Sequence, residues 1–136
     1  MGINVRKTPN WGKYRKRLKK TNDALYSITE GVIVGIIKRT QSGKDEKLKS
    51  FRPYTSAYAR RKGERKVTLT DRGTMLQSID RKIIKNGVRL YFPNATEAKK
   101  AYHNHKTYKR NFFGIDKKQK EHIKTRLGKF IVKTTR

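Results

Sequence analysis

The first long apolar pattern in the chain recurs with the period of a helix. It consists of Leu25, Ile28, Val32, Ile33, Ile36 and Ile37. Thr21 or Asn22 can cap a helix at its start, so we expect a helix over residues 21–39. The β-branched run at residues 32–34 would also suit a buried strand, but the apolar pattern lasts longer than a strand usually does.

The clearest local signal predicts a hairpin. Apolar-rich runs at residues 83–85 and 88–92 flank the pair Asn86-Gly87. Asn-Gly favours a type I′ turn, because both of its turn residues need a positive φ. Pro93 ends the second strand, since it has no backbone N–H to donate. A hairpin alone is marginally stable, so we expect helices or further strands to cover its apolar face.

A second helical stripe lies near the end of the chain. It consists of Ile123, Leu127, Phe130 and Ile131. Asp116 and Gln119 precede it with the spacing of a capping box. The pattern predicts a C-terminal helix over about residues 117–134.

Shorter elements fill the middle of the chain. Asp71 would cap a short helix that turns its apolar residues, Met75, Leu76 and Ile79, inward. Residues 95–104 resemble another short helix, and an aromatic turn at residues 51–58 leads into a third. With no internal repeat, the prediction is one α+β domain over residues 21–136. A central antiparallel hairpin or small sheet would be flanked by helices.

The first twenty residues are basic and contain no acid. Trp11 and Tyr14 are interleaved with lysines and arginines, and Pro9 and Gly12 disfavour regular structure. Such a segment has little to bury, so we expect residues 1–20 to be a basic extended arm.

Charge narrows the choice of partners. The chain has 37 basic and 10 acidic residues, a formal net charge of +27. A free monomer would repel its copies strongly, so a polyanion or an acidic neighbour is expected. There is no cysteine, which excludes disulfides and thiolate chemistry. No apolar run is long enough to span a bilayer, and the N-terminal stretch lacks the apolar core of a secretory signal, so we expect no membrane partner.

Catalytic patterns are weak. His103-Asn104-His105 resembles the name of a nuclease motif, but adjacent side chains diverge and no carboxylate lies nearby to help hold a metal. A packed or interface histidine is the simpler interpretation. Only Asp45 and Glu46 are adjacent acids, and neither a phosphate-binding loop nor a nucleophile elbow is present. We therefore expect no catalytic residue, metal or cofactor. A nuclease built on the histidines would instead cleave nucleic acid with a metal.

An ordered series of short motifs runs from Ile36 to Gly114. They are Ile37-Lys-Arg-Thr40, Ser42-Gly43-Lys-Asp45, Phe51-Arg-Pro-Tyr54-Thr-Ser-Ala-Tyr58 with Lys62 beyond, Val67-Thr-Leu69-Thr-Asp-Arg-Gly73-Thr-Met75-Leu76-Gln-Ser78, Ala98-Lys-Lys-Ala-Tyr-His103-Asn104 and Arg110-Asn-Phe112-Phe113-Gly114-Ile115. In order and spacing the series resembles the virion morphogenesis, or tail-completion, proteins of Mu-like and related tailed phages. The heavy basic content departs from that family and leaves room for extra contact with DNA or a neighbouring ring.

The resemblance implies a structural protein of the virion, assembled in the host cytoplasm. Such proteins are similar to tail terminators and neck proteins. They form a ring, often six-fold, that caps the tail tube or joins it to the head connector, and DNA passes through. The expected partners are copies of the chain and neighbouring neck, connector and tail-tube proteins. A basic nucleic-acid-binding module, ribosome- or nucleoid-associated, is the alternative function.

Two sets of contact residues follow as hypotheses. Contacts with neighbouring subunits are assigned to Trp11, Tyr14, Phe51, Tyr54, Tyr58, Arg110, Phe112 and Phe113. Aromatic residues are enriched at interfaces, although packing within the domain's own core would explain residues 51–58 and 110–113 equally well. Sequence-independent DNA contacts in the lumen are assigned to Arg81, Lys82, Lys85 and Arg89. Salt bridges between subunits are the alternative for these four.

Overall fold

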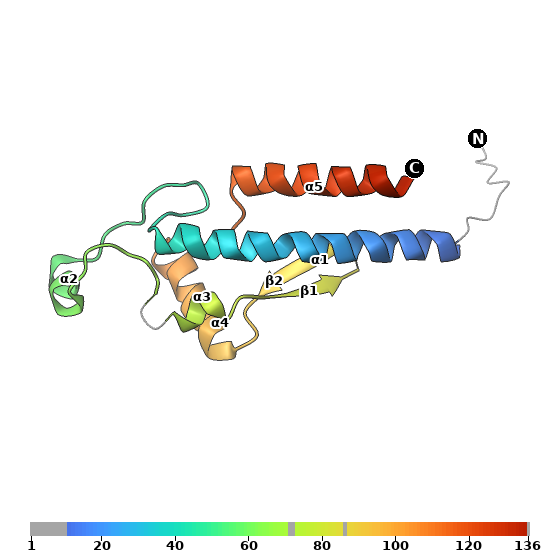
Figure 1. Ribbon diagram of the computed structural model, residues 1–136. Coiled ribbons are helices and arrows are strands. Elements are labelled where there is room, and N and C mark those ends of the chain that lie inside the picture. The colour runs from blue at the N-terminus through green and yellow to red at the C-terminus, as the bar shows by residue number, and fades with distance from the viewer. Residues whose placement is uncertain (1–10, 71–72, 86, 136) are drawn as a thin grey trace, which may run out of the picture.

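The computed structural model describes residues 11–70, 73–85 and 87–135. The chain forms an elongated α+β unit built on one long helix, α1 (Trp11–Gln41), of 31 residues. The last helix, α5 (Lys117–Thr135), lies along one side of α1, and the hairpin and short helices lie on the other (Figure 1). The predicted fold class, a hairpin flanked by helices, is confirmed.

The hairpin is a two-stranded antiparallel sheet. Its strands are β1 (Asp80–Ile84) and β2 (Gly87–Tyr91). Ile84 pairs with Gly87, so Gly87 belongs to β2 and not to the turn, and the connection begins one residue earlier than expected, at Lys85. Asn86 itself lies outside the described residues. Both strands pack against α1, which covers the apolar face of the hairpin as expected.

The remaining elements are short. They are α2 (Ser56–Lys62), α3 (Thr74–Gln77), α4 (Ala95–Tyr102) and the π-helical turns η1 (His103–Thr107) that continue α4. Asn94 caps α4 by accepting a hydrogen bond from the Thr96 amide at 2.8 Å. Met75 and Leu76 of α3 are buried as expected, whereas the predicted cap Asp71 lies outside the described residues. In Figure 1, α2 projects from the end of the molecule opposite the start of α1 and the end of α5.

The start of α1 corrects the predicted arm. Residues 11–20 are helical, so the first helix begins at Trp11, ten residues before its expected start at Thr21. Lys, Arg and Leu are good helix formers, and extending an existing helix avoids the cost of a new nucleus. Gly12 falls in the first turn. Residues 1–10, with Pro9, lie outside the described part of the chain.

The core lies between the C-terminal half of α1, the hairpin and α4. Its buried members are Val32, Ile36, Phe51, Val67, Leu69, Met75, Leu76, Ile79, Ala101 and Phe112. They come from segments spread over most of the chain. The core therefore depends on how the loops are held against α1.

One buried arginine joins the end of α1 to the start of α5. Nη1 of Arg39 donates to Oδ2 of Asp116 at 3.1 Å and to Oε1 of Gln119 at 3.0 Å. Nη2 donates to the backbone carbonyls of Phe112 and Gly114 at 2.8 and 2.7 Å. Only 7% of Arg39 is exposed. Its guanidinium thus fixes the loop before α5 against α1.

The capping box at α5 is confirmed and extends this contact. Oδ1 of Asp116 accepts from the Gln119 amide at 2.8 Å, and the Gln119 side chain accepts from the Asp116 amide at 3.0 Å. Nε2 of Gln119 also donates to the Val32 carbonyl at 3.0 Å. A Cβ at Gly35 would overlap this amide, so a larger residue there would displace the Gln119 side chain from its hydrogen bond to Val32.

We expect Arg39→Met to destabilise the fold by about 3 kcal/mol, because it removes the donor to Oδ2 of Asp116, to the buried Phe112 carbonyl and to the part-buried Gly114 carbonyl. Urea unfolding followed by circular dichroism would measure the change. Lys38→Met is the matched control: Lys38 is exposed, so its effect should stay within about 0.5 kcal/mol. Equal midpoints for the two variants would contradict the assigned role.

Two glycine substitutions should have opposite effects. Gly87 has φ +155°, and an added Cβ would meet only Leu25, at 3.8 Å. Gly87→Ala should therefore cost about 1–2 kcal/mol through backbone strain alone. Gly31 lies in α1 with nothing within 4 Å of an added Cβ, so Gly31→Ala should stabilise by about 0.5–1 kcal/mol. Thermal unfolding of both variants checks the signs, and a stabilised Gly87→Ala protein would show that the backbone is not strained.

Candidate functional site

The two faces of the hairpin have different surroundings. Adjacent residues on a strand point to opposite faces, which separates Arg81 from Lys82. The guanidinium carbon of Arg81 lies 4.1 Å from the ring centroid of Tyr26 in α1. Its Nη2 lies 3.6 Å from a carboxylate oxygen of Glu30, and its side chain is 16% exposed. Arg81 is thus engaged by Tyr26 and Glu30 of its own chain, and its assignment as a DNA contact stays a prediction.

The other three predicted DNA contacts lie together. Lys82 and Arg89 face each other directly across the strands, and both are exposed. Nζ of Lys82 lies 4.8 Å from the ring centroid of Tyr91. Lys85 is exposed at the tip of the hairpin. Within the described residues none of the three cations forms an ion pair.

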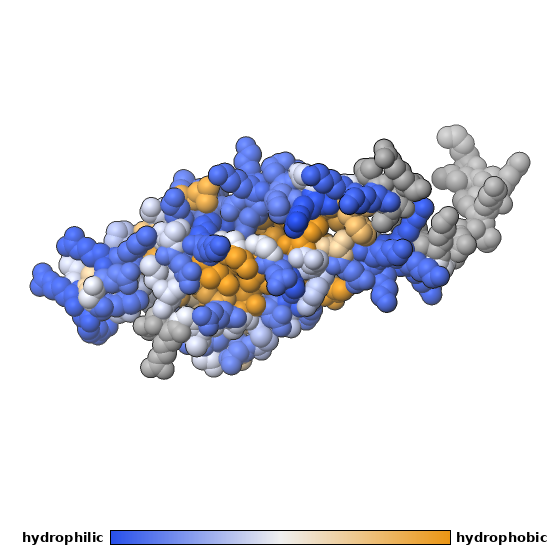
Figure 2. Space-filling model, in the orientation of Figure 1, coloured by the Kyte–Doolittle hydropathy of each residue, from blue (hydrophilic) through white to orange (hydrophobic). Residues whose placement is uncertain are grey.

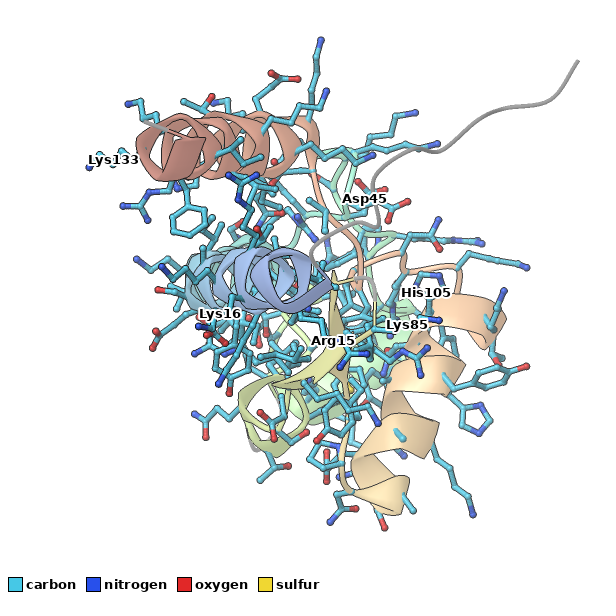
Figure 3. The ribbon with its side chains drawn as sticks, turned by 90° about the vertical axis from the view of Figure 1, so that its right-hand side faces the viewer. Arg15, Lys16, Asp45, Lys85, His105 and Lys133 are labelled. Carbon is cyan, nitrogen blue, oxygen red and sulfur yellow. The ribbon has the colours of Figure 1, made fainter. Side chains whose placement is uncertain are left out.

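Helices α1 and α5 bring more cations to the same end of the molecule. The view in Figure 3 looks onto this end, with Arg15 and Lys16 on α1, Lys85 on the hairpin and Lys133 on α5. We define the basic end by its exposed cations: Arg15, Lys16, Arg17, Lys19, Lys20, Lys82, Lys85, Arg89, Lys129 and Lys133. The sequence indicated the charge of residues 15–20 but not the rigid helix that presents it.

The positive charge of the basic end is not neutralised by salt bridges. The structure has four salt bridges among its described residues, formed by Arg39–Asp116, Arg81–Glu30, Lys100–Glu97 and Lys124–Glu121. No member of the basic end takes part in them. Figure 2 shows the apolar surface of one face gathered in the middle of the molecule, with hydrophilic surface toward both ends of the described chain.

A cluster of tyrosines and cations lies near the opposite end. The rings of Tyr54 and Tyr58 are 4.8 Å apart. The Arg110 guanidinium lies 5.3 Å from the Tyr54 centroid and 4.8 Å from that of Tyr108. Lys62 donates a hydrogen bond to the Tyr54 hydroxyl at 3.1 Å. We call Tyr54, Tyr58 and Tyr108 the tyrosine cluster.

The cluster contains part of the predicted neighbour contacts. Tyr54, Tyr58 and Arg110 come together there. Tyr58 is 40% and Tyr108 58% exposed. Sequence reasoning did not assign Tyr108 to this set, although it lies in the same basic, aromatic loop as Arg110. Its position beside Arg110 was the available signal.

Among the other predicted neighbour contacts, the three phenylalanines do not form an exposed surface. Phe51 and Phe112 are buried in the core, Phe112 completely, which favours the alternative of packing within the domain. Phe113 packs against the core, with its ring 4.9 Å from that of Phe92. The side chains of Trp11 and Tyr14 lie outside the described residues.

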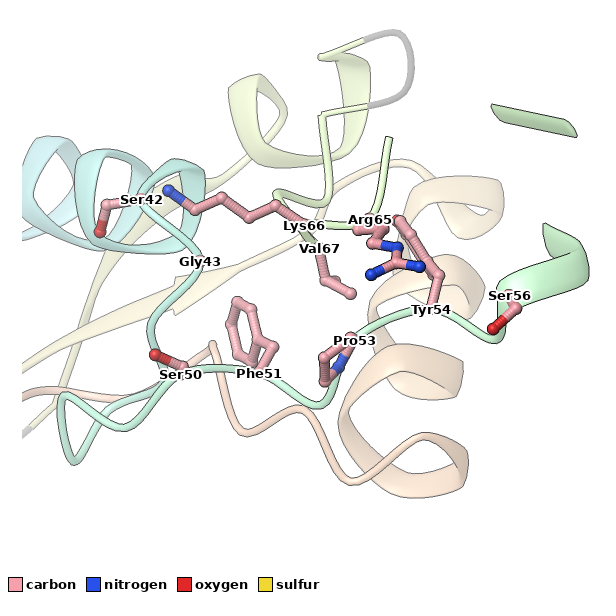
Figure 4. A pocket seen from close by; sticks show the side chains of 10 residues that line it. All are labelled: Ser42, Gly43, Ser50, Phe51, Pro53, Tyr54, Ser56, Arg65, Lys66 and Val67. Atoms are coloured by element: carbon pink, nitrogen blue, oxygen red, sulfur yellow. The ribbon is translucent and has the colours of Figure 1, made fainter. Parts of the chain in front are cut away.

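A pocket of about 590 Å³ adjoins the tyrosine cluster (Figure 4). It is lined by Ser42, Gly43, Ser50, Phe51, Pro53, Tyr54, Ser56, Arg65, Lys66 and Val67. The lining combines hydroxyls and two cations with an apolar floor and contains no acid or histidine. Such a pocket can accept a polar or anionic segment, but it holds no general acid–base pair.

The histidines make local contacts. Nδ1 of His103 lies 3.3 Å from the Thr107 hydroxyl. Asn104 donates to the Lys100 carbonyl and accepts from Arg110. In the part of the chain that the structure describes, no group of three or more histidines and acids is placed to hold a metal ion. Among the same residues, no helix combines the length and apolarity needed to cross a membrane.

Comparison of the chain with protein-family models, with curated proteins and with solved structures gave no match.

Proposed function

We propose that the protein is a structural component of a tailed-phage particle, not an enzyme. In this proposal it forms a ring at the head–tail neck or the tail terminus, through which DNA passes. The observation that carries the proposal is the ordered motif series that resembles the tail-completion proteins. These scattered motifs meet in one place in the fold.

The motifs provide most of the core and the contact that organises it. Arg39, in the first motif, binds the backbone of Phe112 and Gly114 in the last. Phe51, Leu76 and Phe112 come from three different motifs and are buried in the same cluster. A resemblance carried by residues that build one core supports a shared fold, and the ring function follows from that family.

The projecting end supplies a surface suited to self-association. A closed ring needs two different patches on each copy, which meet head to tail. The tyrosine cluster is partly exposed beside α2, and tyrosine and arginine are the residues that most often dominate interface energies. The adjoining pocket offers a recess for a segment of the next copy. These features support contacts between copies at this end.

The net charge favours the alternative, a basic nucleic-acid-binding module. Such a protein would bind RNA or DNA tightly as a monomer or dimer and would need no ring. The two functions therefore differ in the oligomeric state of the purified protein.

We expect the full chain to form closed rings in mass photometry and negative-stain images at high salt, where repulsion between copies is screened. The double variant Tyr58→Ser/Tyr108→Ser should weaken each contact by about 2 kcal/mol and dissociate the rings. Its melting temperature should change little, because neither side chain belongs to the buried core.

Tyr102→Ser is the matched control. Tyr102 is 63% exposed but lies outside the cluster, so its rings should persist. A wild-type chain that stays monomeric at every salt concentration, and that is missing from purified particles of its phage, would refute the ring function.

A further inference from the structure

We propose that the basic end binds the phosphate backbone of duplex nucleic acid, with Lys82, Lys85 and Arg89 of the hairpin at its centre. This surface is available to a single copy of the chain, so its binding does not require a ring.

The hairpin carries a pair of like charges that a bound anion would stabilise. Lys82 and Arg89 are direct cross-strand partners on one face. Side chains at such positions start about 5 Å apart, and like charges there destabilise the sheet. A phosphate bound between the two cations would replace this repulsion by attraction.

Further exposed cations lie on α1. Lys19 and Tyr26 follow Arg15 in α1 by four and eleven residues. At this spacing the three residues share one face of the helix. Tyr26 holds Arg81 of β1, which places the hairpin on that side of the helix. Gly87 at the start of β2 lies beside Leu25, so the exposed cations of residues 15–20 lie along α1 beyond this end of the hairpin, whereas Lys82 and Arg89 are on the hairpin face turned away from Arg81.

Composition favours phosphate over an acidic protein. Residues 1–22, 81–96 and 122–136 contain no carboxylate. Lysine is depleted at protein–protein interfaces, whereas nucleic-acid interfaces are strongly positive. Between residues 15 and 20 every residue except Leu18 is a lysine or arginine, so this stretch has few apolar anchors of the kind a protein partner would need.

The contacts should be indifferent to sequence. Lysine and arginine that meet phosphates fix position but do not read bases. Binding of this kind weakens steeply as salt rises, because each phosphate contact releases condensed counterions.

The test is fluorescence anisotropy of the full chain on two short duplexes of unrelated sequence over a range of salt. The variant Lys82→Gln/Lys85→Gln/Arg89→Gln should bind both duplexes more weakly by the same factor, at least about tenfold at low salt. The slope of log affinity against log salt should fall by about three. The melting temperature should not decrease, since the variant removes a like-charge pair.

The matched control is Lys44→Gln/Lys47→Gln/Lys49→Gln, which removes the same charge from exposed positions on the loop after α1. It should leave affinity and slope nearly unchanged. An equal loss in both triple variants would mean that diffuse charge alone binds DNA and would overturn the assignment. Tighter binding of the wild type to polyglutamate than to duplex would overturn it in favour of an acidic protein partner.

Mass photometry of the same samples separates this proposal from the ring function. Rings that persist while DNA binding falls support the basic end as the DNA contact. Loss of rings with unchanged DNA binding would instead assign these residues to contacts between copies and would refute the proposal.

Discussion

The buried guanidinium of Arg39 is the contact on which the arrangement of the helices depends. It brings together α1, the carbonyls of the loop at residues 112–114 and the Asp116–Gln119 capping box. The same loop carries Phe112 into the centre of the core. A single side chain therefore sets both the alignment of α5 on α1 and the depth to which the loop is inserted.

Features determined by short stretches could be predicted from the sequence. The hairpin, the capping box and the extent of α5 each depend on a few neighbouring residues, so their patterns were readable. Arg39 was not: as one of 37 basic residues it carries no local sign of burial. Its partners lie more than 70 positions away, and only the folded chain brings them together.

In the candidate site too, local features were predictable from the sequence and long-range contacts were not. Arg81 and Lys82 are neighbours of similar chemistry, and alternation along β1 places them on opposite faces. Which face meets α1 depends on Tyr26 and Glu30, which the strand's own sequence does not reveal. For Phe51 and Phe112, the residue type alone did not distinguish a core position from an interface position, because aromatic residues suit both equally well.

The unbroken length of α1 has a mechanical consequence. No proline interrupts its 31 residues, so the helix spans about 45 Å as one strut between the cations at its start and the loops held at its end. A force applied to the cations is carried along this strut to Arg39 and the loop that inserts Phe112. The distance between the cations at the start of α1 and the loops at its end is set by the number of residues in the helix. Each helical turn inserted or removed would change this distance by about 5.4 Å.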